Sequence, residues 1–245
     1  MQQTPWLTRQ CVGTPRMRLY CLPYAGGGAE IYAGWHAALP GVEVCTVQLP
    51  GRGIRFREAP LDTLPELLAE LAQLTSQDRA LPFALFGHSL GALIAFELAR
   101  YCRRHYLPLP QRLIVSGCDA PNQRETGGGM HRLPDADLIA ALRTYNGTPP
   151  QVLAHADLMA LVLPSIRADF ALSERYAYRV QPPLALPLSV YVGKDDPLLS
   201  AATVKGWDVE TSETCRTRWF NGDHFFVHGQ RDAVLAALRD DLALP

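Results

Sequence analysis

Apolar residues follow two alternating patterns along this chain, short runs and longer runs with helical spacing. The short runs predict strands over residues 17–22, 42–49, 83–86, 112–117, 188–193 and 218–220. The longer runs predict helices over residues 30–39, 63–75, 90–101, 134–145 and 157–178, the last interrupted at Pro164. Strands that alternate with helices in this way predict an α/β fold, with a mostly parallel sheet and right-handed crossovers.

The alternation pauses between residues 119 and 187, where helical patterns follow one another without a strand. We expect a helical insertion over about 120–186, with a mobile joint at the three glycines 127–129. It would form a lid, because ligands of parallel sheets bind at the carboxyl ends of the strands. Apolar residues exceed the need of one buried face at Leu158, Met159, Leu161, Val162, Leu163, Ile166 and Phe170. They predict an apolar pocket under the lid, while most of them are expected to pack on the sheet.

The sequence Gly87-His88-Ser89-Leu90-Gly91 falls between a predicted strand and a predicted apolar helix. It fits the G-x-S-x-G turn, in which a strained backbone lifts a serine hydroxyl clear of the sheet. Glycines two before and two after the serine let the strand and the helix approach closely. Ser89 is therefore the predicted nucleophile. The alternative is that it only caps the helix that follows.

The candidate base is a histidine near the end of the chain. In α/β hydrolases the catalytic residues follow the chain order serine, acid, histidine. Of the seven histidines, only His224 and His228 come after the acidic loop that follows residues 188–193. His224 leaves the last predicted strand and would activate Ser89 as general base. We expect His228 to be a solvated residue at the start of the C-terminal helix, and the side chain of His88 to diverge from that of the serine.

The acid is one of two neighbouring aspartates. Asp195 and Asp196 both leave the strand predicted at 188–193. A carboxylate at this point would fix the imidazole tautomer and stabilise the imidazolium. Spacing alone does not separate the two residues; we choose Asp196, which precedes Pro197, and keep Asp195 as the alternative. Asp223 is expected to shape the histidine loop.

A glycine-rich loop at residues 23–28 follows the first predicted strand. It lacks the Lys-Ser/Thr ending of a phosphate-binding P-loop and does not match G-x-G-x-x-G in full. Such a loop can instead supply a backbone amide to an oxyanion hole. Ala25 is the predicted donor, and Leu90 beside the nucleophile is the second. The alternative is a plain tight turn.

Composition narrows the classes of protein. With 245 residues, 48% of them hydrophobic, and a formal net charge of -1, the chain is expected to form a single domain over 1–245 that binds neither nucleic acid nor membrane. Six scattered cysteines without a C-x-x-C pair predict reduced thiols and no metal site. The first residues lack the basic and apolar regions of a signal peptide, so we expect a cytoplasmic protein.

These motifs together resemble type II thioesterases of nonribosomal peptide and polyketide synthesis, which have the α/β-hydrolase fold. The resemblance spans nearly the whole chain, at residues 22–27, 49–52, 86–92, 146–150, 163–170, 193–197 and 223–226. The lid segments 146–150 and 163–170 make it specific, because many hydrolases share the serine turn. In that family the acid precedes the proline, which favours Asp196. Tyr24 departs from the family, which commonly has histidine there, and Asp223 departs from a common glycine.

The resemblance implies hydrolysis of acyl thioesters on the phosphopantetheine arm of a carrier protein, without cofactor or metal. Such enzymes clear misprimed or stalled acyl groups from an assembly line. One alternative is a small-molecule esterase or an acyltransferase on the same fold, and another is a noncatalytic module that holds a carrier. Because carriers are generally acidic, candidate contacts are the arginines at 52, 55 and 57 or those at 100, 103 and 104.

Overall fold

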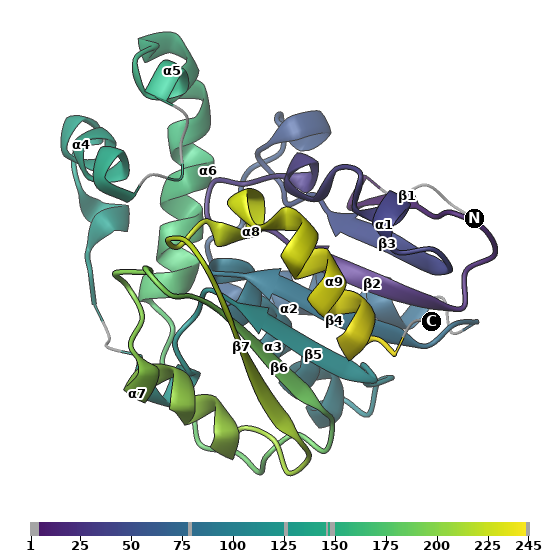
Figure 1. Ribbon diagram of the computed structural model, residues 1–245. Coiled ribbons are helices and arrows are strands. Elements are labelled where there is room, and N and C mark those ends of the chain that lie inside the picture. Colours follow the sequence, from purple (N-terminus) through teal and green to yellow (C-terminus); the bar gives the residue numbers. More distant parts are fainter. Residues whose placement is uncertain (1–4, 78–79, 125–126, 146, 148–149, 244–245) are drawn as a thin grey trace.

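The protein is built on a largely parallel sheet. The computed structural model describes residues 5–77, 80–124, 127–145, 147 and 150–243. Within these residues the strand order is β1-β3-β2-β4-β5-β6-β7 (Figure 1). The strands are β1 (Leu7–Gln10), β2 (Met17–Leu22), β3 (Val42–Val47), β4 (Phe83–His88), β5 (Arg112–Ser116), β6 (Leu188–Gly193) and β7 (Cys215–Phe220). β1 pairs antiparallel with β3, and the other neighbouring strands pair in parallel.

Helices cover both faces of this sheet. In Figure 1, α8 and α9 lie in front of the strands, and α2 and α3 lie behind them. The α-helices are α1 (Trp35–Ala38), α2 (Leu64–Gln77), α3 (Leu90–Arg104), α4 (Asp135–Tyr145), α5 (Pro150–Leu153), α6 (Ala156–Glu174), α7 (Ala201–Lys205), α8 (Phe226–Gly229) and α9 (Arg231–Asp241). The α/β architecture predicted from the alternating pattern is confirmed.

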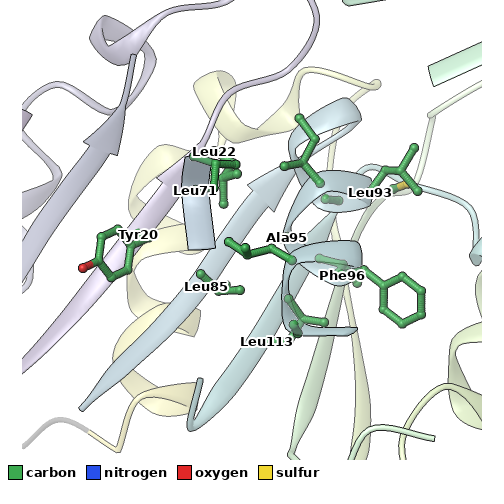
Figure 2. Packing of buried hydrophobic residues seen from close by; sticks show 14 of the residues in the cluster. Tyr20, Leu22, Leu71, Leu85, Leu93, Ala95, Phe96 and Leu113 are labelled. Atoms are coloured by element: carbon green, nitrogen blue, oxygen red, sulfur yellow. The ribbon is translucent and has the colours of Figure 1, made fainter. Parts of the chain in front are cut away.

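Burial on both faces explains why the strands are continuous apolar runs. All positions of β3, β4 and β6 are buried. On one face, Leu85 and Leu113 belong to the same cluster as Phe96 of α3 (Figure 2). On the other face, Phe86 packs edge-on against Trp35, with ring centroids 5.1 Å apart. The start of α3, just after β4, is therefore held firmly against the sheet.

Residues 117–187 connect β5 to β6 and contain α4, α5 and α6. In Figure 1, α4 and α5 project beyond the sheet and α6 leads back toward it. These helices share an apolar cluster of their own: Met130, Leu138, Leu142, Leu153, Met159, Leu163 and Ile166. The expectation that most apolar residues of α6 pack on the sheet is therefore wrong, and Leu158 and Leu161 are 42% and 50% exposed. Of the lid segment 146–150, residues 146, 148 and 149 lie outside the described residues.

Pro164 does not interrupt α6, which runs from Ala156 to Glu174 with the proline inside it. A break was expected because proline lacks an N–H and its ring crowds the carbonyl four residues earlier. Met159 and Leu163 before the proline and Ile166 after it are all buried in the apolar cluster of the insertion. Packing on both sides of the proline therefore outweighs its local cost.

Several short elements differ from the prediction. The helix expected over 30–39 is divided into a 3-10 turn, η1 (Ala29–Tyr32), and α1. Gly34 lies between them with a φ of 74°, a left-handed conformation that a right-handed helix does not contain. β1 and α7 were not predicted, because four or five residues are too few to establish a period.

Candidate active site

Ser89 is the one residue between β4, which ends at His88, and α3, which begins at Leu90. Its φ of 54° and ψ of -116° are unusual for a residue with a side chain, as the predicted strained turn requires. Its amide donates a hydrogen bond of 2.7 Å to the carbonyl of Ser116 on β5, which fixes the turn to the neighbouring strand. Within the described residues its hydroxyl does not cap α3, so the structure does not support the capping alternative.

Two glycines permit the close approach of strand and helix at this turn. A Cβ on Gly87 would lie 2.0 Å from the carbonyl oxygen of Gly91. A Cβ on Gly91 would lie 2.2 Å from the carbonyl oxygen of Leu22 and 2.7 Å from that of Pro23. Side chains do not fit at these distances, so both positions require glycine. The same contacts bring the glycine-rich loop after β2 against the beginning of α3.

His224 and Asp196 form a buried pair at the ends of β7 and β6. Nδ1 of His224 lies 2.7 Å from Oδ2 of Asp196, and the two residues are 8% and 6% exposed. The other carboxylate oxygen of Asp196 accepts a hydrogen bond of 2.9 Å from the amide of Leu198. Asp195 is exposed and instead accepts from the amide of Gly222 at 3.3 Å. The structure thus brings Asp196, and not Asp195, to the imidazole.

Asp223 and His228 lie in the same loop region as His224. Oδ1 of Asp223 accepts from the amide of Phe225 at 2.9 Å, so it shapes the loop as expected. His228 lies within α8, which begins at Phe226. Its Nε2 is 3.0 Å from the hydroxyl of Tyr24. His228 is exposed, as expected, but its contact with the hydroxyl of Tyr24 was not predicted.

His88 is fully buried beneath the site. Its Nδ1 lies 2.9 Å from the hydroxyl of Ser116, and its ring centroid lies 5.2 Å from that of His224. Burial, and then the nearby charge of His224, lower the pKa of His88 well below its usual value. The imidazole next to the serine in sequence therefore stays neutral, and its ring packs at a tilt of 52° against that of His224.

The glycine-rich loop is held by a buried ion pair that the sequence did not reveal. The amide of Gly26 donates to Oδ2 of Asp169 on α6 at 2.7 Å. Both carboxylate oxygens of Asp169 accept from the guanidinium of Arg52, at 2.6 and 2.8 Å, and Arg52 also donates to the carbonyl of Gly27. Within the described part of the chain, the amides of Ala25 and Leu90 have no such acceptor. Ala25 therefore belongs to a loop whose shape depends on α6.

The basic residues proposed to contact a carrier are largely structural. Arg52 is engaged by Asp169, and Arg55 is buried with its guanidinium 3.8 Å from the ring centroid of Trp6. Arg100 is 2% exposed and pairs with Glu97 at 2.7 Å. Those three residues cannot form a docking surface. Exposed arginines in the two groups are Arg57 and Arg104.

The described residues hold neither a metal cluster nor a helix that could span a membrane. No three His, Cys, Asp or Glu side chains there gather as ligands for a metal ion. The helices that the structure describes include none with the length and apolar character needed to cross a membrane. Burial raises the pKa of the Cys45 thiol to about 12, so it is a packing residue rather than a nucleophile.

A parallel sheet with a strained serine after a central strand and a His–Asp pair after the last two strands defines a serine-dependent α/β hydrolase. The family model for the thioesterase domain matches residues 17–242. The gramicidin S biosynthesis protein GrsT of Aneurinibacillus migulanus is 36% identical over 99% of this chain and 96% of its own length. A protein named linear gramicidin dehydrogenase LgrE, from Brevibacillus parabrevis, is 40% identical over 91% of this chain and 87% of its own.

Among solved structures, the type II thioesterase BorB from the borrelidin biosynthetic cluster superposes with a TM-score of 0.88. It is 37% identical, and the match covers 98% of each chain. This chain therefore belongs to the thioesterase family, and the resemblance read from its motifs is confirmed.

Replacing Asp169 by Asn should lower the free energy of unfolding by about 3–5 kcal/mol, because Arg52 would keep a charge without its buried partner. The matched control is Asp62→Asn, whose carboxylate pairs with Arg175 where both side chains are 51% exposed. That change should cost less than about 1 kcal/mol. Urea unfolding of both variants checks this; equal losses would contradict a special role for the buried pair.

The depressed pKa of His88 should make stability fall with acidity. Because the unfolded imidazole binds a proton near pH 6.5 and the folded one does not, stability is present above that pH and is lost below it. Between pH 7 and 5 the loss should approach about 1.4 kcal/mol per pH unit for this group. His228, whose pKa burial also lowers, adds to the slope. His88→Gln should flatten the dependence in urea titrations; an unchanged slope would exclude His88 as its source.

Proposed function

We propose that this chain is a type II thioesterase that removes acyl groups from the phosphopantetheine arm of carrier proteins in nonribosomal peptide or polyketide synthesis. Ser89 is the nucleophile, His224 the base and Asp196 the acid. The observation that supports this most directly is the 2.7 Å contact between His224 and Asp196, at the edge of the sheet where the strained turn presents Ser89. The similarity to a type II thioesterase over 98% of the chain supports the substrate class.

In the first half of the reaction, the hydroxyl of Ser89 attacks the thioester carbonyl while Nε2 of His224 accepts its proton. Asp196 accepts from Nδ1–H of His224, which keeps the correct tautomer and stabilises the imidazolium. The amides of Ala25 and Leu90 donate to the developing oxyanion. The imidazolium then protonates the departing thiolate, which leaves a free thiol on the carrier and an acyl ester on Ser89.

In the second half, His224 takes a proton from water, and the resulting hydroxide attacks the acyl ester. Collapse of the second oxyanion returns the proton to Ser89 and releases the carboxylic acid. We further propose that the insertion between β5 and β6 acts as a lid that limits how much water reaches this ester. The enzyme would act in the cytoplasm on a carrier partner, and its six free cysteines are consistent with a reducing compartment.

The substrate class is tested by single-turnover release of acyl groups from an acylated carrier, beside the matching small thioester and oxygen ester. Wild type should favour the carrier-bound thioester, and Ser89→Ala should reduce its release at least about a thousandfold. Equal or faster turnover of the oxygen ester would identify a general esterase instead. Transfer of the acyl group to an added alcohol would identify an acyltransferase.

The assignment of the acid is tested by two neighbouring variants. Asp196→Asn removes the charge facing Nδ1 of His224 and should lower kcat by about 10³–10⁴-fold, because the imidazole takes the wrong tautomer. Asp195→Asn changes only a surface contact to Gly222 and should keep kcat within about threefold. Steady-state kinetics on the same thioester compare the two. A larger loss in Asp195→Asn would reverse the assignment.

A further inference from the structure

Tyr24 links the loop after β2 to α8, the helix that follows the candidate base. It directly precedes Ala25 in the loop after β2, and its hydroxyl lies 3.0 Å from Nε2 of His228. His228 belongs to α8, four residues after His224. A single hydrogen bond therefore joins the loop that carries the Ala25 amide to the segment that follows the candidate base.

The ring of Tyr24 also reaches His224 through a neighbour. Tyr24 packs edge-on against Phe225, with centroids 5.1 Å apart and an interplanar angle of 74°. Phe225 packs edge-on against His224, at 5.1 Å and 89°. His88 forms a second link, since its centroid lies 5.8 Å from that of Tyr24 and 5.2 Å from that of His224. Edge-to-face contacts of this kind favour one relative orientation of each pair of rings.

Phe225 also contacts a residue of the insertion, Gly147. A Cβ on Gly147 would lie 2.4 Å from Cζ of Phe225, so the backbone of Gly147 lies directly against this ring. Phe225 is thus confined between Tyr24, His224 and the insertion. If Tyr24 loses its fixed position, the ring that supports His224 gains room to move.

The hydrogen bond adds no charge to the site. Burial, and then the charge of Glu30, raise the pKa of Tyr24 to about 12. Burial lowers the pKa of His228, and it keeps His88 neutral as well. Tyr24 and His228 can therefore affect the position of His224, but they do not act on it through an electric charge.

We propose that Tyr24, anchored by His228, is a positioning residue that holds His224 through Phe225 and holds the Ala25 amide through the shared loop. This inference rests on the proposed roles of His224 and Ala25. It assigns a task to a residue at which this chain departs from the histidine common in its family, and to a histidine outside the catalytic set.

The test uses Tyr24→Phe, which keeps the ring and removes only the hydroxyl. We expect kcat for the acyl thioester to fall three- to tenfold while KM stays within twofold, because ground-state binding is untouched. His228→Leu should give the same loss, His228→Gln should restore most of it, and the double variant should fall no further than either single one. Tyr106→Phe is the matched control, since that tyrosine is 96% exposed, and it should behave as wild type.

Two further readouts separate positioning from general damage and from an error in the proposed function. The NMR signal of the proton between Nδ1 of His224 and Asp196 should broaden or shift in Tyr24→Phe while the melting temperature stays the same. Labelling of Ser89 by a fluorophosphonate, which needs no carrier, should slow by the same factor as kcat.

Unchanged kcat, labelling and NMR signal, or additive losses in the double variant, would overturn the inference. If wild type labels well but does not favour carrier thioesters, the proposed substrate fails, and slower labelling of Tyr24→Phe still supports the inference.

Discussion

Ser89 keeps its φ of 54° because backbone atoms pack closely against the glycines on both sides of it. Gly87 and Gly91 leave no room for a Cβ, and the carbonyl of Leu22 presses against Gly91. A residue in such a region costs of order 1–3 kcal/mol and persists only where its surroundings fix it. Here the surroundings are β4 and α3, both buried in the largest part of the core. The position of Ser89 between strand and helix and the close contact of the β2 loop follow from that one constraint.

The buried carboxylate of Asp169 connects the insertion to the glycine-rich loop that contacts this turn. Asp169 is fully buried, and a carboxylate in that position is tolerated only when its oxygens are well paired. Arg52 and the Gly26 amide supply the pairing, from two loops that lie far from Asp169 in sequence. A displacement of α6 would therefore break bonds to the loop that carries Ala25. The element that forms the proposed lid and the proposed oxyanion donor are parts of one hydrogen-bonded unit.

The sequence predicted best what depends on local pattern. β4 and β6 are apolar runs because both faces are covered, and the serine turn has a fixed spacing of glycines. Chain order left His224 and His228 as candidate bases, and the position of His224 at the end of the last predicted strand decided between them. The family resemblance favoured Asp196, which precedes the proline, over Asp195. The pair of Arg52 and Asp169 could not be found this way, because no local pattern shows that residues 117 positions apart meet. The helix break predicted at Pro164 was wrong for the same reason. Packing of α6 in the apolar cluster of the insertion outweighs the local effect of the proline.

His224 pairs with the carboxylate of Asp196 and packs against the rings of His88 and Phe225. His88 is held uncharged by burial, and the charge of a protonated His224 nearby depresses its pKa further. Were His88 to bind a proton as well, two positive imidazoles would oppose each other with their centroids 5.2 Å apart. Tyr24 and Phe225 are groups that bear no charge near neutral pH. In the proposed mechanism His224 must hold a proton briefly, and this arrangement leaves Asp196 as the charge that faces it directly.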